Sequence, residues 1–249
     1  MDLITKIRQA EAPLHAASEH TGFIKKITDG TATKETYGEY LFNLHAMYKA
    51  IEETLDANAN NEVLKPFVTK ELYKHELIEK DLEYLLGDSA KNLTLLASTK
   101  AFLARIDEIK DTNHELIIAD AYTRFLADLF GGRMFMDLFT NRYHIAKEGL
   151  NYYKCEGVDD IRTYVMGYAM KLNNLNLSED LEKKLIDEVS NAYIYNLAVS
   201  CELEFKLNPP QRQEYAQHPH SHPHGQQHTQ HPHHPHNHQH PHQHHPHHK

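Results

Sequence analysis

Apolar residues recur at spacings of three and four along most of the chain up to about residue 205, the period of an α-helix with one buried face. No stretch alternates apolar and polar residues for long enough to predict a sheet. Clusters of Gly, Asp and Asn separate the periodic stretches, as is typical of loops. The pattern therefore predicts an all-α domain of about seven or eight helices. The clearest periodic stretches are Tyr37–Leu55, Thr69–Leu86, Ser98–Ile109, Ile117–Phe139, Ile161–Leu172 and Leu181–Phe205.

The last predicted helix has a recognisable beginning and end. Ser178 is a typical N-cap, and two acidic residues follow it where the helix dipole favours negative charge. A Pro-Pro pair at 209–210 then stops the helix. Beyond it the chain is mostly His, Pro and Gln, a composition that cannot offset the entropy lost by ordering the backbone. We therefore predict a helical domain over residues 1–208 and a disordered tail over residues 209–249.

The chain of 249 residues is 40% hydrophobic, enough for a substantial core, and carries a formal charge of −9. A nucleic-acid-binding surface needs clustered Lys and Arg, so this acidic balance argues against one. No apolar run approaches the roughly 18 residues of a transmembrane helix, and the N-terminus lacks the apolar segment of a signal peptide. With only two cysteines, Cys155 and Cys201, we expect a reduced, cytoplasmic protein and interpret both as inert, partly buried thiols.

The segment Ala121–Phe135, AYTRFLADLFGGRMF, carries the most chemistry. A helix through it places Arg124, Asp128 and the pair Gly131–Gly132 along one face. Adjacent glycines cost a helix about 2 kcal/mol relative to alanines. They fit a helix that bends, or one that a flat ligand touches closely. The carboxylate one turn earlier can then order water or a reacting ligand, although a surface Arg–Asp pair beside a kink has the same spacing.

His15 and Glu19 form a second candidate pair, close to the N-terminus. On a helix, Glu19 lies one turn after His15 and can hold its second ring nitrogen, as carboxylates do for metal-ligating histidines. A solvated surface pair has the same spacing, and His20 competes with His15 for the role of a ligand. The spacing alone leaves these interpretations open.

Together these segments resemble the heme oxygenase family, over nearly all of the chain before the tail. That family has an Ala-Tyr-Thr-Arg-aromatic-Leu-Gly-Asp-Leu-Ser-Gly-Gly run over the distal face of the heme, which stands here as AYTRFLADLFGG at residues 121–132. Its proximal histidine precedes a glutamate by four residues and a phenylalanine by eight, as His15 precedes Glu19 and Phe23. This match selects His15 over His20.

The resemblance implies a fold in which heme lies between a proximal and a distal helix, and an enzyme that opens heme to biliverdin, carbon monoxide and ferrous iron. It implies His15 as the axial ligand of the heme iron and proton supply by Asp128 through an ordered water. The resemblance also implies that Arg124, Tyr48 and Asn196 form a hydrogen-bond network with Asp128. The heme-binding candidates besides His15 are Glu19, Arg8, Tyr122, Thr123, Gly131, Gly132 and Lys171.

Several positions depart from the family pattern. Ala127 stands where the family usually has glycine, Phe130 replaces a serine, and Phe102 replaces a tyrosine of the water network. On the propionate side a frequent arginine is missing, which leaves Lys171 or Arg162 as substitutes. These changes leave a non-catalytic heme-binding or heme-buffering protein as the main alternative.

The tail holds 16 of the 22 histidines. Neutral imidazoles suit Ni(II), Zn(II), Cu(II) or Co(II), so we predict that the tail binds a divalent metal. A solubilising tail, bis-His heme binding and metal storage are the other interpretations. The repeat that best represents the predicted ligands holds His231, His233, His234 and His236.

The partners follow from what the chain lacks. No dinucleotide fingerprint or cysteine cluster is present, so the electrons must come from a ferredoxin, a flavodoxin or a reductase. We expect no nucleic-acid or membrane partner, and a monomer.

A di-iron oxidase on a similar helical scaffold is a further alternative, which needs facing acidic and histidine ligands. The candidate ligands, which form no convincing set, are His75, Glu76, Asp137 and His144. Candidates for a basic docking patch are Lys6, Arg8, Lys25 and Lys26.

Overall fold

The computed structural model describes residues 1–209, and within this range it contains helices and loops only, which confirms the all-α prediction. The α-helices of this range are α1 (Leu3–His20), α2 (Gly22–Asp29), α3 (Lys34–Ala57), α4 (His75–Leu86), α5 (Ala97–Thr112), α6 (Ile117–Asn141), α7 (Ile161–Asn173) and α8 (Glu179–Leu207). Short 3₁₀ turns connect them: η1 (Lys65–Phe67), η2 (Lys70–Leu72), η3 (Gly87–Asn92), η4 (His114–Leu116), η5 (Lys147–Gly149) and η6 (Asn151–Tyr153).

Five of the six predicted stretches lie inside helices, and the sixth begins too early. The predicted stretch Thr69–Leu86 is a 3₁₀ turn followed by α4, which starts only at His75. The buried Glu52 side chain explains this start, because its Oε1 accepts the backbone N–H of Lys74 at 2.5 Å and that of His75 at 3.3 Å. Glu52 lies on α3 and thus caps a helix from a distant part of the chain, which no local pattern reveals.

The beginning of α8 agrees with its predicted cap. The Ser178 side chain accepts the backbone N–H of Leu181 at 3.2 Å, and acidic residues occupy the first turn. The helix ends at Leu207, just before the predicted Pro-Pro stop. The tail, with its predicted disorder and its metal ligands His231, His233, His234 and His236, lies outside the described residues.

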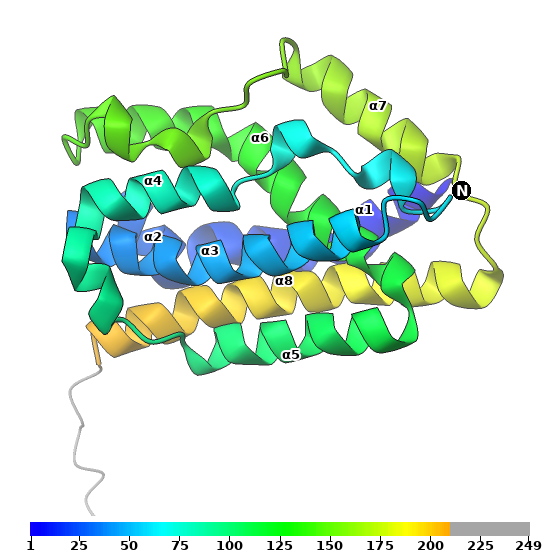
Figure 1. Ribbon diagram of the computed structural model, residues 1–249, viewed down its shortest axis with the longest axis horizontal. Helices are drawn as coiled ribbons and strands as arrows, with labels where there is room; N and C mark the ends of the chain where they lie inside the picture. The colour runs from blue at the N-terminus through cyan, green and yellow to red at the C-terminus, as the bar shows by residue number, and fades with distance from the viewer. Residues whose placement is uncertain (210–249) are drawn as a thin grey trace, which may run out of the picture. The chain divides into compact units, whose positions relative to one another are not determined.

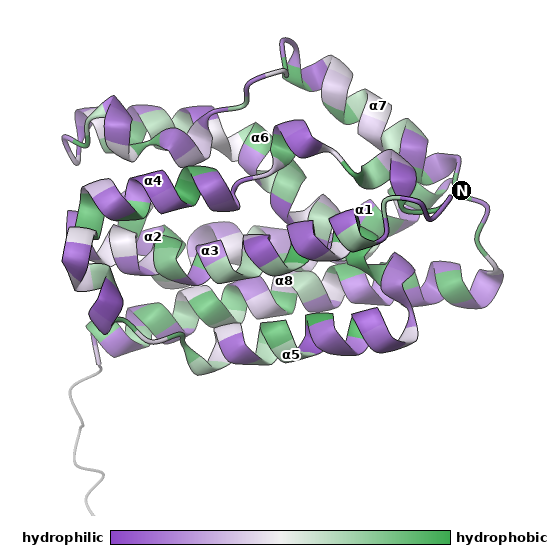
Figure 2. Ribbon diagram, in the orientation of Figure 1, coloured by the Kyte–Doolittle hydropathy of each residue, from purple (hydrophilic) through white to green (hydrophobic). Residues whose placement is uncertain are grey.

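Two long helices organise the packing. α8 packs against α1, α2, α5 and α6, and α3 packs against α4, α5 and α6. Figure 1 shows α4, α3, α8 and α5 as neighbouring rods. Figure 2 shows hydrophobic and hydrophilic positions interspersed along these rods, as expected of helices with one buried face. Within residues 1–209, no helix combines the length and the apolar character needed to cross a membrane.

The burial of α6 changes along its length. From Ile117 to Leu126 every residue is buried, whereas Ala127, Phe130 and Met134 are exposed. Asp128 and Gly131 are partly buried beside them. The second half of α6 therefore presents one face that the rest of the described chain does not cover, next to the predicted catalytic residues.

Candidate functional site

Arg124 forms the centre of the site. Its guanidinium is nearly buried, and its N–H groups contact four side chains. One of these lies one turn away on α6, and the other three come from distant parts of the chain. Nη1 donates to Asn196 Oδ1 at 2.9 Å, and Nη2 lies 3.3 Å from Asp128 Oδ1. Nη2 also donates to the Tyr152 hydroxyl at 2.8 Å, and Nε to that of Tyr48 at 3.4 Å. The structure thus brings together the predicted residues Arg124, Asp128, Tyr48 and Asn196.

Tyr152 is the member of this network that sequence reasoning missed. Its hydroxyl donates to Asp128 Oδ1 at 2.6 Å. It lies in η6, which the buried Asp81 of α4 holds in place by accepting the backbone N–H groups of Asn151 and Tyr152 at 2.8 and 2.7 Å. A 3₁₀ turn held by a distant carboxylate has no helical spacing, so no signal in the sequence connects Tyr152 with Asp128.

Asp128 has one oxygen in the network and one oxygen without a partner. Oδ1 contacts Tyr152 and Arg124, whereas Oδ2 is buried and has no hydrogen-bond partner among the described residues. Burial raises the pKa of this carboxyl to about 8, partly opposed by the Tyr152 hydrogen bond, which lowers it. A buried polar atom without a partner normally binds water or a ligand. Asp128 can therefore hold a proton near neutral pH, and its free Oδ2 can pass that proton to a water or a ligand.

The glycine pair follows Asp128 on α6, and the helix continues through it. A Cβ atom on Gly131 would meet the Phe135 ring at 3.4 Å, and one on Gly132 would meet the Tyr153 ring at 3.5 Å. Both are ordinary contact distances, so the internal packing does not require glycine at either position. Since each glycine destabilises a helix by about 1 kcal/mol, the pair favours close approach of a ligand over the alternative of an accidental kink.

The exposed face of α6 is apolar beside this pair. Phe130 is 66% and Met134 57% exposed, although both are large hydrophobic side chains. With Ala127 they lie at helical spacing along the face that carries Gly131. Large apolar side chains grouped in this way mark a binding surface more often than a solvated one.

His15 on α1 is less constrained than the sequence pattern predicts. Its side chain is 50% exposed, and its Nδ1 lies 3.7 Å from Glu19 Oε1, which is too long for a hydrogen bond. The predicted orienting bond from Glu19 is therefore not formed in this structure. One edge of the ring contacts Tyr193, with 5.9 Å between the ring centroids. The His15 ring nitrogens are thus accessible to a ligand.

A hydrogen bond joins α1 to α6 one turn before His15. The Tyr122 hydroxyl donates to Glu11 Oε1 at 3.0 Å, and burial raises the pKa of Glu11. Glu11 was not among the predicted residues. Thr123 is buried, and its hydroxyl has no partner within the described part of the chain. Tyr122 thus connects α1 to α6, and the contact of Tyr122 and Thr123 with heme stays a prediction.

Arg8 and Lys171 lie outside the Arg124 network. Arg8 is exposed on α1, and Lys171 on α7 places its Nζ 6.0 Å from the centre of the Tyr168 ring. Phe102, which replaces a hydroxyl of the family pattern, is fully buried against the Tyr195 ring. The structure therefore leaves the role of Arg8 and Lys171 toward the propionates as a prediction.

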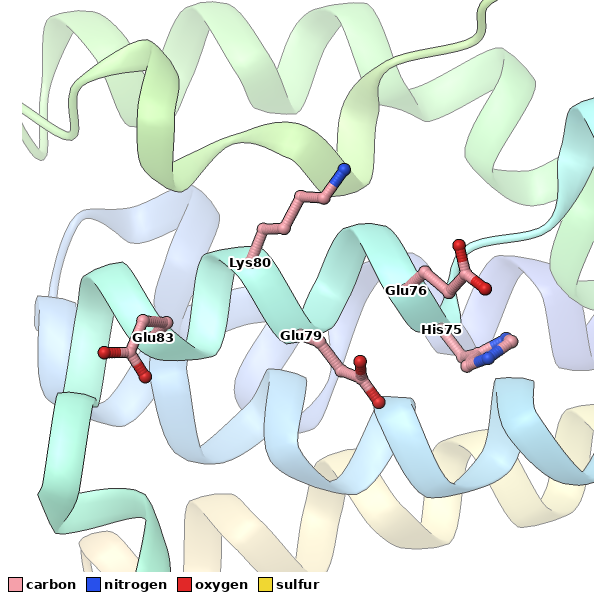
Figure 3. A pocket seen from close by; sticks show the side chains of 5 residues that line it. All are labelled: His75, Glu76, Glu79, Lys80 and Glu83. Carbon is pink, nitrogen blue, oxygen red and sulfur yellow. The ribbon is translucent and has the colours of Figure 1, made fainter.

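A separate groove lies on α4, away from this network (Figure 3). Its side chains come from one helix, with His75 and Glu79 on one side and Lys80 on the other. Within residues 1–209 no three His, Cys, Asp or Glu side chains are grouped to hold a metal ion. The ligands that a di-iron oxidase needs are thus not assembled in this range.

Comparisons with known proteins agree on one family. A sequence model described as heme oxygenase matches residues 1–202. A heme oxygenase of Rhodella violacea is 28% identical over 204 residues, which cover 81% of this chain and 87% of the relative. Among solved structures, heme oxygenase from Leptospira interrogans gives a TM-score of 0.76 at 27% identity, over 81% of this chain and 100% of that one. Heme oxygenase-1 from Synechocystis in complex with heme gives a TM-score of 0.78 at 26% identity, over 83% of this chain and 94% of that one.

Proposed function

This chain belongs to the heme oxygenase family, and from that premise we propose that it opens heme to biliverdin, carbon monoxide and ferrous iron with dioxygen and supplied electrons. The observation that carries the proposal is the buried Arg124 network, which leaves Oδ2 of Asp128 free beside the exposed face of α6. A non-catalytic heme-binding protein would not need a buried carboxyl that holds a proton near neutral pH.

The residues present fit heme. Phe130 and Met134 offer apolar surface to a flat macrocycle, and the partly exposed Gly131 lets it approach the helix backbone. Gly132 is buried against Tyr153, so its contact with heme stays a prediction. His15 offers an accessible imidazole that would hold the heme iron. Bound heme supplies the iron that activates dioxygen and is itself the substrate that is opened.

The protein's own contribution is orientation and proton supply. Arg124 holds the Asp128 side chain in one position, with Asn196 and Tyr48 holding the guanidinium. Asp128 keeps its proton up to about pH 8 and presents Oδ2 for transfer through a water. Tyr152 donates to the other oxygen and keeps the pKa of Asp128 from rising further.

Electrons come, in this proposal, from a ferredoxin, a flavodoxin or a reductase. The basic docking patch predicted from the sequence is largely neutralised, because Lys6, Lys25 and Lys26 form ion pairs with Glu182, Asp29 and Glu204. Arg8 is exposed and forms no ion pair with the described residues, so we propose it as the main contact of an acidic donor in this region.

The tail carries a separate proposal. Its sixteen histidines bind a divalent metal such as Ni(II), Zn(II), Cu(II) or Co(II), by the ligand preference of imidazole. This region lies outside the described residues, so the support is its composition. The monomeric state and the cytoplasmic location also stay predictions from the sequence.

The test uses the full chain with one equivalent of hemin, a reductase with NADPH, and catalase to remove free peroxide. We expect the Soret band to disappear and biliverdin to form. His15→Ala in the same full chain is the control for heme held by tail histidines, and it should form no biliverdin. A Soret band that persists in the reduced, aerated wild-type protein would contradict the enzyme assignment.

A further inference from the structure

Lys74 is a buried lysine next to a cysteine. It lies just before α4 and is 2% exposed. Its Nζ donates to the backbone carbonyl of Lys154 at 2.6 Å and lies 3.4 Å from Cys155 Sγ. Among the described residues no carboxylate forms an ion pair with this amine. Burial lowers the pKa of the Lys74 amine, partly opposed by Cys155 and Glu52, so the net shift is toward the neutral, nucleophilic form.

Cys155 differs from the second cysteine in this respect. Cys155 is partly exposed, so a small oxidant can reach it, and the Lys74 Nζ lies 3.4 Å from its sulfur. Cys201 on α8 is exposed, which corrects the prediction that both thiols are partly buried, and no lysine amine bonds to its sulfur among the described residues. Cys201 therefore serves as an internal control, a thiol without a neighbouring amine.

We propose that Cys155 and Lys74 form a covalent sulfenamide link when hydrogen peroxide oxidises the thiol. Peroxide first converts the Cys155 thiol to a sulfenic acid and is reduced to water. The Lys74 Nζ lone pair then attacks Sγ, so the N–S bond forms, the S–O bond breaks, and the hydroxide leaves as water with a proton from the amine. A thiol reverses the link by attacking the sulfur, which releases the amine and forms a mixed disulfide.

The link would join two segments that support the catalytic network. Cys155 follows Tyr152 by three residues, and Tyr152 bonds to Asp128. The backbone N–H of Lys74 bonds to Glu52, which lies one turn after Tyr48 on α3. A bond between Lys74 and Cys155 thus fixes the loop that presents the Tyr152 hydroxyl. This proposal concerns the heme-free chain and does not depend on the proposed reaction.

The test treats the heme-free full chain with hydrogen peroxide and a chelator, in the presence of dimedone, which traps free sulfenic acids. Peptide mass spectrometry should find Lys74 and Cys155 in one linked pair about 2 Da lighter than the two separate peptides. Trypsin should no longer cleave after Lys74, and dithiothreitol should restore both peptides. Cys201 should form the dimedone adduct without a lysine link.

Lys74→Arg is the matched variant, since it keeps N–H donors for the Lys154 carbonyl but has no amine that condenses with sulfur. In this variant Cys155 should form the dimedone adduct, as Cys201 does, and circular dichroism checks that it folds. If it does not fold, Cys201→Ser keeps the natural pair and must still form the link. An equal dimedone adduct at Cys155 in the wild-type chain and in Lys74→Arg, or oxidation of wild-type Cys155 without a link, would overturn the proposal.

Discussion

Arg124 on α6 is buried and bonds to four side chains, whereas His15 on α1 is half exposed and its ring has no hydrogen bond among the described residues. Both residues belong to the same proposed heme site. The α6 side is organised by the fold itself, through contacts from α3, α8 and η6.

This difference shows which part of the site needs its substrate. The α6 side, which we propose to supply the proton, is preformed, as expected where a charge must be stabilised without reorganisation. We expect the His15 side to gain order when a ligand binds the imidazole. Substitutions on the α6 side should therefore change the stability of the heme-free protein, and substitutions around His15 should act only on the heme-bound form.

Arg124→Met should have the largest effect. It removes the guanidinium and leaves Asp128, Asn196 and Tyr152 without their shared partner in a buried site. We expect the free energy of unfolding to fall by about 3–5 kcal/mol, because each buried polar group left without a partner costs about 1–3 kcal/mol. Denaturant unfolding of the heme-free chain measures this loss. Arg133→Met, on the exposed side of the same helix, is the control and should change it by less than about 0.5 kcal/mol. Equal losses in the two variants would refute a preformed network.

Asp128 should make stability depend on pH in a direction opposite to that of most carboxylates. Its folded-state pKa of about 8 lies above the unfolded value, so the folded chain keeps a proton that the unfolded chain releases. The stability that this proton contributes is complete at low pH and is lost as the pH rises through about 8.

Between about pH 6 and about pH 9 the wild-type chain should therefore lose roughly 2.5–3 kcal/mol more than Asp128→Asn. Chemical unfolding of both proteins at the two pH values measures this difference. The contributions of the other titrating groups are the same in both proteins and therefore cancel. An equal loss in both proteins would show that Asp128 is ionised throughout this range.

Tyr152→Phe should have a moderate effect on both the network and its titration. It removes the hydroxyl that bonds to Asp128 and Arg124, so we expect a loss of about 1–1.5 kcal/mol of stability. The pKa of Asp128 should rise further, because the hydrogen bond that lowers it is gone. The pH profile of heme degradation should move to higher pH accordingly. Tyr153→Phe, at the neighbouring stacked ring, should leave that profile in place.

Glu19→Gln should have the smallest effect, and only with heme bound. The contact between Glu19 and His15 spans 3.7 Å between half-exposed side chains, so the heme-free chain should keep its stability within about 0.5 kcal/mol. Heme should dissociate up to about 10-fold faster, because a carboxylate that orients an iron ligand is lost. Glu53→Gln removes a similar exposed pair with Lys49 on α3 and should change neither quantity.

The sequence was sufficient for most of the helices and for the contact between Arg124 and Asp128. Helical periodicity predicted α6, and the spacing of Arg124 and Asp128 predicted their contact, because both depend on a single helix. Tyr48 and Asn196 came from the family resemblance, since they lie on other helices. Their side chains do meet Arg124 in the structure.

The remaining features depend on buried carboxylates that act across the fold. Asp81 holds the turn that carries Tyr152, and Glu52 sets the start of α4. Each is one residue whose partners lie at least 22 positions away along the chain. No periodicity or motif links such residues, so Tyr152 and the late start of α4 could be found only in the structure.

The most direct test of the central claim compares the wild-type chain with Asp128→Asn, measuring heme affinity and biliverdin yield in the same preparation. We expect both proteins to bind heme with equal affinity through His15. The variant should form biliverdin at least about 100-fold more slowly, because the proton donor is lost. Biliverdin formation by Asp128→Asn at the wild-type rate would contradict the account and separate the preformed network from catalysis.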